Sequence, residues 1–387
     1  MAAGPKGAAG ERGEYGAPAP TTDPRLPSHY AINGRFGAQR VTGVQRVAHA
    51  LLRALDAQER LPGQWQLLAP PGIEWPPLAR IALASRGFPP GGGHAWEQWA
   101  VAEAAARGAR VLNIAGSGPW LGGPQVSWLH DAAVFDHPQA YRPAFVAWYR
   151  ALFRRRASRG DLLLVPSRFA QQRLALALGV PESRLLVLPH GADHLDAVEP
   201  DASALQLLGL ADADFWLCIA SANPTKNLQR LLAAHARLPA AGRPRLVLAG
   251  GANPRVFAPS SAAPAGSGVM HVAAPGDALL KALLRQARAL VLPSLVEGFG
   301  LPAVEARRAA CAVVAARAGA LPEVCGPRAE YVDPLDVDDI CRGLQATLAP
   351  GHLAWLRGEG PEGAAARCWG DVAHDLLRLL ADWEASR

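Results

Sequence analysis

The sequence predicts an α/β protein built from two consecutive units, each a mostly parallel sheet with helices on both faces. Three observations indicate this class. The 387 residues are enough for two or more domains, and half of them are hydrophobic, so the chain can bury large cores. Short apolar runs of strand length also alternate with helical patterns along most of the chain, which is typical of parallel sheets.

The composition of the chain sets the boundaries of the two units. Residues 1–28 are rich in Gly, Ala, Pro and charge without periodicity, so we expect this segment to be disordered. The first unit is placed at residues 29–195 and the second at 205–365. A polar, acidic stretch between them, residues 192–214, contains the predicted interdomain linker.

The elements follow in order along the chain. Tyr30–Ile32 predicts a first strand, and the polar segment 33–43 predicts a loop. Apolar residues then recur at helical spacing from Val44 to Leu55, with Thr42 as the N-cap. Later strands of the first unit are predicted at Val111–Ile114, Val126–Leu129, Leu162–Val165 and Leu185–Leu188. Strands of the second unit are predicted at Phe215–Ile219, Arg245–Ala249, Val269–Ala273, Ala289–Leu292 and Ala312–Ala315, with helices that include Leu228–Leu238 and Ala278–Ala287.

Charge and cysteine content exclude several functional classes. The net charge of +6 suits a partner rich in phosphate or an anionic membrane surface, but the basic residues are too scattered for a nucleic-acid site. The densest run, Arg154–Arg156, fits either a solvated helix face or a contact with lipid phosphate. The five cysteines are odd in number and lack C-x-x-C spacing, which argues against a zinc site or disulfides and fits the cytosol. No apolar run reaches the roughly 18 residues of a membrane span, so we expect any membrane contact to be peripheral.

The most informative segment is V-L-P-S-L-V-E-G-F-G-L-P-A-V-E, from Val291 to Glu305. A strand is expected to end here, followed by a glycine loop and a helix that begins with Pro302 at its first position. Backbone N–H groups at such a helix start bind phosphate. The carboxylates of Glu297 and Glu305 can accept hydrogen bonds from sugar hydroxyls on either side. The alternative is a surface loop with a glutamate that balances the helix dipole.

Two further positions follow predicted strands. Lys226, in the turn after the first strand of the second unit, can neutralise a diphosphate as a point charge, or it can be an ordinary solvated lysine. His130 directly follows the strand at Val126–Leu129 and is expected to point into the crevice, where it positions a reactant or handles a proton. The alternative for His130 is a core histidine or a cap.

The E-G-F-G-L-P-x-x-E block resembles the two-glutamate signature of retaining GT-B glycosyltransferases, especially glycosyltransferase family 4. The Lys226–Asn227 pair and the H-D-A-A-V-F-D-H-P segment that begins at His130 resemble further motifs of that family. The resemblance extends over about residues 29–385 and is strongest to bacterial mannosyltransferase-like members. Other matching segments are W-E-Q at 96–98, V-P-S-R-F at 165–169, P-H-G-A-D-H at 189–194, L-P-E-V at 321–324 and V-D-P-L-D-V at 332–337.

The resemblance implies a GT-B fold, in which two Rossmann-like domains face each other across a cleft and a C-terminal helix, here 368–387, returns to the first domain. It places Glu297 at the donor sugar, Glu305 at the nucleotide ribose and Lys226 at the diphosphate. It places His130 beside the sugar and the leaving group, with Asp131 and His137 orienting the loop. The residues implied for binding the nucleotide sugar are Lys226, Asn227, Glu297, Gly298, Phe299, Gly300, Leu301 and Glu305, and those implied for catalysis are His130, Glu297 and Lys226.

The loop after the first strand also resembles its counterpart in bacterial members. Gly34, Arg35, Thr42 and Gly43 are expected to lie between the donor phosphates and the acceptor, with glycine permitting close approach of the backbone to a ligand. Arg35 and Arg46 are expected to contact a phosphate or to form structural salt bridges.

Other positions depart from the family pattern. Thr225 stands where a basic residue is common, Ser221 and Ala222 stand where an arginine is common, and Ala310, Cys311, Ala312 and Ala316 replace glycine, proline and small polar residues. The triplet Asp212–Asp214 resembles a metal-binding motif of a different glycosyltransferase fold, but its place in the linker predicts a structural role.

The resemblance therefore implies transfer of a hexose with retention, from a nucleotide sugar to a glycan or a lipid-linked acceptor in polysaccharide or lipopolysaccharide assembly. GDP-mannose is the favoured donor, with UDP- and ADP-hexoses open. We expect neither a metal nor another cofactor, and a cytoplasmic protein that can lie on the membrane face. The alternatives are another GT-B enzyme, such as a nucleotide-sugar epimerase or a phosphorylase, and a non-catalytic protein that binds sugar nucleotides.

Overall fold

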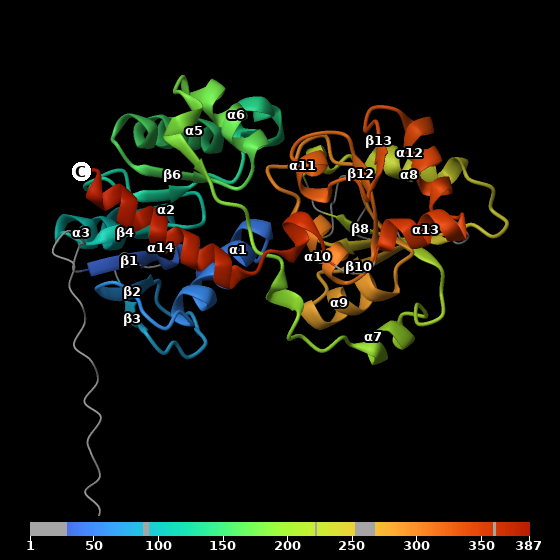
Figure 1. The fold of residues 1–387 in the computed structure, drawn as a ribbon, viewed down its shortest axis with the longest axis horizontal. Coiled ribbons are helices and arrows are strands. Elements are labelled where there is room, and N and C mark those ends of the chain that lie inside the picture. The colour runs from blue at the N-terminus through green and yellow to red at the C-terminus, as the bar shows by residue number, and fades with distance from the viewer. Residues whose placement is uncertain (1–28, 88–92, 221–222, 252–267, 359–360) are drawn as a thin grey trace, which may run out of the picture.

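The computed structural model describes residues 29–87, 93–220, 223–251, 268–358 and 361–387. The predicted disorder of residues 1–28 and the departures at Ser221 and Ala222 lie outside these ranges. Figure 1 shows two α/β lobes side by side. The predicted fold class is confirmed, because each lobe contains one sheet and every strand pair in both sheets is parallel.

The first sheet has seven strands in the order β3-β2-β1-β4-β5-β6-β7. The strands are β1 (His29–Asn33), β2 (Gln64–Ala69), β3 (Ile81–Ser85), β4 (Arg110–Asn113), β5 (Val126–Trp128), β6 (Leu162–Val165) and β7 (Leu185–Val187). The helices of this part are α1 (Gly43–Asp56), α2 (His94–Trp96), α3 (Ala102–Ala106), α4 (Ala133–Asp136), α5 (Pro143–Ser158) and α6 (Arg168–Leu178). Alternate residues of β1 face opposite sides, so Tyr30 and Ile32 enter one apolar core while Ala31 enters another.

The second sheet has six strands in the order β10-β9-β8-β11-β12-β13. They are β8 (Phe215–Ala220), β9 (Arg245–Gly250), β10 (Val269–Ala273), β11 (Ala289–Leu292), β12 (Ala312–Ala316) and β13 (Glu330–Val332). The helices that follow the first domain are α7 (Ala202–Leu207), α8 (Leu228–Arg237), α9 (Asp277–Gln286), α10 (Leu301–Arg308), α11 (Leu321–Cys325), α12 (Val337–Ala346), α13 (Pro350–Arg357) and α14 (Trp369–Ala385). Two separate apolar cores, one on each face, hold helices against this sheet.

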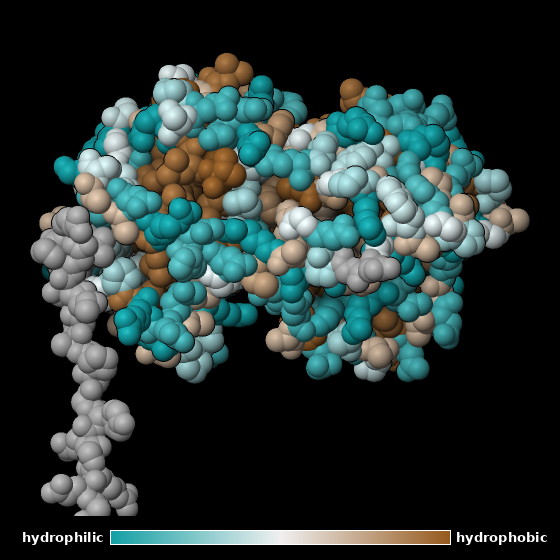
Figure 2. Space-filling view, viewed as in Figure 1, coloured by the Kyte–Doolittle hydropathy of each residue, from teal (hydrophilic) through white to brown (hydrophobic). Residues whose placement is uncertain are grey.

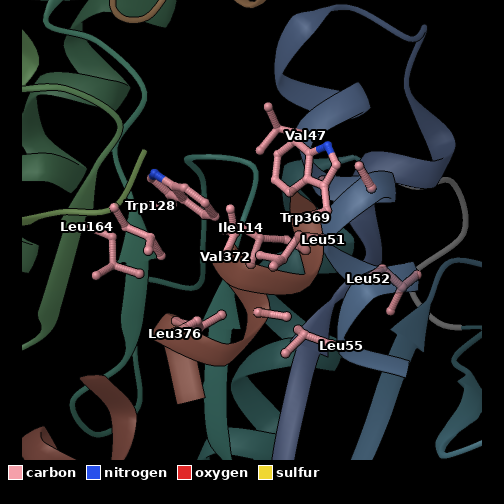
Figure 3. Packing of buried hydrophobic residues seen from close by; sticks show 14 of the residues in the cluster. Val47, Leu51, Leu52, Leu55, Ile114, Trp128, Leu164, Trp369, Val372 and Leu376 are labelled. Atoms are coloured by element: carbon pink, nitrogen blue, oxygen red, sulfur yellow. The ribbon is translucent and has the colours of Figure 1, made fainter. Parts of the chain in front are cut away.

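The last helix leaves the second domain and packs on the first. Trp369, Val372 and Leu376 of α14 share one buried core with Leu51 and Leu55 of α1 (Figure 3). The chain thus crosses between the domains twice, and the two crossings touch: the amide of Ala192 donates to the carbonyl of Arg367 over 2.9 Å. Figure 2 shows that most of the visible surface is hydrophilic, with its largest hydrophobic area on the first domain.

Several elements differ from the sequence prediction. Strands β2, β3 and β13 were not predicted. Only Ile81 is buried in the edge strand β3, and β13 has only three residues. Neither β3 nor β13 therefore shows a strong apolar pattern. The expected loop at 33–43 contains a 3₁₀ helix at Gly34–Ala38, and the linker region contains α7. Helix α10 begins at Leu301, so Pro302 is its second residue and Glu305 lies beyond its first turn.

Candidate functional site

The second domain brings Lys226 and Glu297 together at the carboxyl ends of neighbouring strands. Lys226 ends a short 3₁₀ helix after β8, and Glu297 lies in the loop after β11. The ammonium Nζ of Lys226 donates to Oε1 of Glu297 over 2.6 Å, and the Ser294 hydroxyl donates to the same oxygen over 2.7 Å. Both side chains keep some solvent exposure, 23% for Lys226 and 12% for Glu297. A cation and a carboxylate are therefore poised at the edge where α/β sheets bind ligands.

The glycine loop after Glu297 contacts the first domain directly. A Cβ atom at Gly298 would lie 2.1 Å from the carbonyl oxygen of His130, so only glycine permits this approach. The Ser167 hydroxyl, at the N-cap of α6, donates to the Gly298 carbonyl over 2.6 Å. Gly300 then adopts a φ of 96° as the N-cap of α10, a conformation that favours glycine. The loop is thus fixed between the two domains.

His130 lies under this loop with a neutral imidazole. Its Nε2 lies 3.0 Å from the carbonyl oxygen of Ile114, so Nε2 carries the hydrogen. Burial lowers the pKa of His130 to about 4, and the hydrogen bond to Ile114 opposes this shift only in part. Its Nδ1 is buried and finds no partner within the described ranges, which leaves a lone pair beside the interdomain contact.

Glu305 lies in a polar network that joins three parts of the chain. Nε2 of His194 lies 2.7 Å from Oε1 of Glu305, and Nδ1 of His194 lies 3.2 Å from Nε1 of Trp369. Because the indole N–H can only donate, Nδ1 accepts and Nε2 donates to Glu305. Arg46 of α1 lies 3.6 Å from the same carboxylate and pairs with Asp277 over 2.8 Å. Of the two roles expected for Arg46, the structure shows the salt bridge.

The N-terminal loop residues are held by the first domain. A Cβ atom at Gly34 would lie 2.4 Å from the Leu68 carbonyl oxygen, so glycine at this position permits close packing on β2. Arg35 donates to the Ser117 hydroxyl over 3.0 Å. Thr42 is the N-cap of α1, as predicted, and its amide donates to the Gln45 side chain. Gly43, the first residue of α1, has open space around its Cα.

Other predicted residues have contacts that fix the loops. Asn227 is buried, and its amide nitrogen donates to the carbonyls of Pro293 (3.0 Å) and Pro334 (2.6 Å), so this side chain ties two loops together. Phe299 and Leu301 are buried in the core that continues across the domain boundary. Asp131, three residues after the end of β5, accepts from the amide of Ala133, the first residue of α4, over 2.8 Å. Asp214 of the D-x-D triplet pairs with Arg288 over 2.5 Å, consistent with a structural role.

The predicted basic run on α5 does not form a patch. Arg154 is exposed, but Arg155 lies over the ring of Trp120 and Arg156 is 2% exposed and pairs with Asp161. Helix periodicity explains the difference, because three consecutive residues point in three directions. The three arginines therefore do not share one solvated face.

Sequence reasoning assigned no role to His190 and Glu323, although both lie in motifs that it quoted. His190 is buried among the rings of Trp128, His130 and Phe299, at centroid distances of 5.2, 5.5 and 4.6 Å. Glu323 of α11 accepts from the amides of Arg168 and Phe169 at the start of α6, across the domain boundary. The P-H-G-A-D-H and L-P-E-V motifs contain these two residues and could have drawn attention to them. Their contacts could not be predicted from the motifs, because the contacted residues are far away in the sequence.

Two family models match the chain. Residues 209–351 match "Glycosyl transferases group 1", and residues 41–194 match "Glycosyltransferase Family 4". The chain is 34% identical over 250 residues to an MMP alpha-(1->4)-mannosyltransferase of Mycolicibacterium hassiacum, covering 62% of this chain and 58% of that protein. It is 29% identical over 231 residues to the O-antigen chain mannosyltransferase B of Escherichia coli, covering 58% of this chain and 61% of that protein. The matched region thus spans about three fifths of these relatives.

A solved structure shows the same fold. Sucrose-phosphate synthase from Thermosynechococcus elongatus superposes with a TM-score of 0.69 at 20% identity, over 93% of this chain and all of that chain. Together the two family models take in more than half of the chain, and each falls on one of the two domains. The chain therefore belongs to the family 4 and group 1 glycosyltransferases, which have the GT-B fold.

Proposed function

We propose that this protein is a retaining hexosyltransferase that moves mannose from GDP-mannose to a hydroxyl of a glycan or lipid-linked acceptor in polysaccharide or lipopolysaccharide assembly. The observation that carries the proposal is the Lys226–Glu297 pair, which lies next to Gly298, the residue that contacts the backbone of His130. Family membership and the mannosyltransferase relatives support the reaction class and the sugar.

The pair suggests how the site responds to its substrate. The diphosphate of a nucleotide sugar competes with Glu297 for the Lys226 ammonium, because phosphate oxygens carry more charge than one carboxylate. Once released, Glu297 accepts hydrogen bonds from the sugar hydroxyls. The amides at the start of α10, with those of the glycine loop, face the phosphates. These groups stabilise the charge that develops on the leaving diphosphate.

His130 suits a positioning role in this reaction. Its imidazole is neutral over the physiological pH range, since burial lowers its pKa to about 4. Its Nε2–H is held by Ile114, so Nδ1 is the atom that accepts a hydrogen bond from a sugar hydroxyl. We propose no covalent nucleophile.

We propose that the reaction needs no metal, because Lys226 and the α10 amides supply the positive charge that a metal would otherwise supply. Activity in excess EDTA should equal activity in its absence. A loss of activity that Mg²⁺ or Mn²⁺ restores would contradict this part of the proposal.

Peripheral contact with an anionic membrane is also part of the proposal, on the basis of the net charge of +6 and the exposed Arg142 and Arg154 of the α5 region. Among the described helices, none is both long and apolar enough to cross a bilayer. Pelleting with phosphatidylglycerol vesicles at physiological salt tests the contact, and protein that stays in the supernatant would argue against it.

The first experiment is a thermal-shift panel of nucleoside diphosphates and their sugars, followed by a transfer assay with the ligand that stabilises the protein. A ligand at a hundred times its Kd stabilises by about 2.7 kcal/mol. We expect GDP-mannose to give the largest shift, and NMR of the product to show the retained anomeric configuration. Conversion of the sugar nucleotide without an acceptor would favour an epimerase, and binding without turnover would favour a non-catalytic protein.

Lysine variants provide the matched test of the site. Lys226→Gln should lower turnover on the order of 100-fold, the usual effect of removing one group that stabilises developing charge. Lys281→Gln is the control, because the ammonium of Lys281 in α9 donates to the Asp196 carbonyl and not to Glu297. Equal activity of the two variants would contradict the proposed site.

A further inference from the structure

A row of aromatic rings runs along α5 of the first domain. Phe145 and Tyr149 are four residues apart on α5, so helical geometry aligns their rings. Tyr141 precedes the helix in extended backbone, and its ring stacks on that of Phe145. The ring centroids of Tyr141 and Phe145 lie 5.3 Å apart, and those of Phe145 and Tyr149 lie 4.3 Å apart. Phe145 is 41% exposed, so this part of the row faces solvent.

The row continues from Tyr149 into two other segments. The ring of His94, in α2, lies 5.9 Å from Tyr149 and 5.4 Å from Trp148. Trp148 in turn lies 6.0 Å from Trp120, whose other neighbour is the Arg155 guanidinium at 4.8 Å. We call these six side chains the ring row: Tyr141, Phe145, Tyr149, His94, Trp148 and Trp120.

One end of the ring row lies beside the Lys226–Glu297 pair. Burial raises the pKa of Tyr141 to about 12; the charges of Asp131 and Glu297 add to the rise, and a hydrogen bond with the side chain of Asn223 opposes it. Asn223 belongs to the turn that carries Lys226. A molecule bound along the ring row therefore has its Tyr141 end at the site of the proposed transfer.

The other end of the ring row carries polar groups whose charges offset one another. Glu97 is fully buried and accepts hydrogen bonds from Asn33 over 2.6 Å and from Ser117 over 2.7 Å. Ser117 accepts in turn from Arg35. Burial alone would raise the pKa of Glu97, but the hydrogen bond with His94 and the charge of Arg35 lower it, so the carboxylate is ionised. The negative charge of Glu97 compensates the guanidinium, which disfavours an anionic ligand here.

Two N–H groups at this end lack acceptors. Nε of Arg35 and Nε1 of Trp148 are buried and have no hydrogen-bond partner in the part of the chain that the structure describes. Both groups can only donate. A buried N–H group without an acceptor is costly, so a ligand that offers neutral oxygen acceptors is favoured at this position.

We propose that the ring row binds the acceptor as an uncharged saccharide chain that extends from Tyr141 toward Trp120. Sugar rings have C–H faces that pack on aromatic rings, and hydroxyl oxygens that accept from N–H groups such as those of Arg35 and Trp148. A lipid tail supplies no acceptor, and a phosphate gains no net attraction here because Glu97 offsets the charge of Arg35. The inference rests on the proposed function, which makes the bound molecule an acceptor.

Binding of saccharides in the absence of any nucleotide sugar tests the ring row. The probes are α-linked mannose oligosaccharides of increasing length, titrated into the full-length protein in a calorimeter. We expect affinity to rise with length, because a longer chain covers more rings. Phe145→Ala should weaken binding of the longest probe at least about tenfold. Trp148→Phe, which keeps a ring but removes the N–H group, should weaken binding several-fold.

The control is Trp355→Ala, because Trp355 is 49% exposed on α13 of the second domain and also lies on another ring, that of His352. This variant should bind the probes as the wild type does. Melting temperatures close to that of the wild type would show that each variant is folded. Binding of no probe by the wild type, or unchanged binding by Phe145→Ala, would overturn the proposal.

A second arm separates the saccharide from a lipid surface. Wild type and Phe145→Ala are pelleted with phosphatidylglycerol vesicles, and equal association of the two proteins supports the saccharide assignment. Loss of vesicle association in Phe145→Ala would assign the ring row to the membrane and overturn the proposal. Turnover of GDP-mannose is measured separately, so saccharide binding that persists without turnover would contradict the proposed function and leave the ring row as a saccharide site.

Discussion

His194 donates from Nε2 to Oε1 of Glu305 over 2.7 Å, and this bond joins the interdomain linker to the second domain. The histidine is itself held by the indole of Trp369 at the start of α14. One oxygen of the Glu305 carboxylate is therefore fixed by the protein, which leaves the other to meet a ligand. The orientation of Glu305 thus depends on both chain crossings between the domains.

Replacement of His194 should weaken both the fold and the binding of the nucleotide sugar. In His194→Asn, the buried Oε1 of Glu305 loses its partner, at a cost of about 1 to 3 kcal/mol. We expect a lower melting temperature and a KM for the nucleotide sugar that is higher by about tenfold. His352→Asn is the control, since His352 forms a similar pair with Glu330 at a more accessible position, with the His352 side chain 35% exposed, where such pairs contribute about 1 kcal/mol or less. Equal effects of the two variants would refute the role of His194.

Addition of one methyl group at Gly298 should separate the two halves of the site. In Gly298→Ala, the new Cβ would lie 2.1 Å from the His130 carbonyl oxygen, so the loop must move away. A displacement of about 1 Å costs on the order of 100-fold in rate when reactants must be aligned, and steady-state kinetics would show this loss in kcat. Gly276→Ala is the control, because a Cβ there meets no atom within 4 Å. A kcat equal to that of the wild type would show that the Gly298 contact is not needed for turnover.

The end of α10 should become more stable with glycine at position 310. Ala310 has a φ of 55°, and the amide of Cys311 donates to the Ala306 carbonyl, the arrangement in which helices commonly end in glycine. Ala310→Gly should raise the free energy of unfolding by roughly 0.5 to 1 kcal/mol. The neighbouring variant Ala309→Gly, at a φ of −82°, should lower it. Denaturant titrations in which Ala310→Gly is the less stable variant would contradict this reading.

Stability should fall in mild acid because two histidines are buried as neutral rings. Burial lowers the pKa of His130 to about 4, and burial with the charges of His130 and His194 lowers the pKa of His190 well below 6.5. In the unfolded chain each ring takes up a proton near its ordinary pKa of about 6.5. The unfolded state therefore binds more protons below that pH, so their contribution to stability is complete above pH 6.5 and declines toward pH 4.

Unfolding titrations between pH 7 and pH 4 measure this decline. His190→Phe removes one of the two titrating rings while keeping an aromatic side chain, so stability should fall less steeply with acid than in the wild type. His352→Gln, at a half-buried position in the second domain, should follow the wild-type curve. A His190→Phe curve with the wild-type slope would show that His190 is not held neutral.

The sequence was most informative where strands are buried on both faces. Such strands are continuous apolar runs, as at Leu162–Val165 and Ala289–Leu292, and the structure has strands there. The edge strands β3 and β13 lack that pattern, because most of β3 is exposed or half-buried and β13 has only three residues, so composition alone did not reveal them. The arrangement of the two domains was predicted only from the motif resemblance, because hydrophobic periodicity indicates single helices and strands and not how domains lie relative to one another.

The candidate site was predicted in its residue types but not in its contacts. Glu297 and Lys226 were singled out by motif, yet their pairing joins positions 71 residues apart and became visible only in three dimensions. The Arg46–Asp277 salt bridge likewise joins two domains. The role of Asn227 in donor binding stays a prediction, and the structure adds that its amide ties two loops together, a contact that the motif did not reveal.

The position of α14 determines when the first domain can finish folding. Five residues of this final helix complete the core that begins at Tyr30: Trp369, Val372, Ala373, Leu376 and Leu380. A ribosome that has just made β7 must still synthesise the whole second domain before this helix emerges, which takes roughly 10 to 40 s at typical elongation rates. During that interval the apolar face of α1 lacks its cover. The first domain therefore exposes an apolar surface until α14 has been synthesised, and a chain cut before residue 369 stays in that condition.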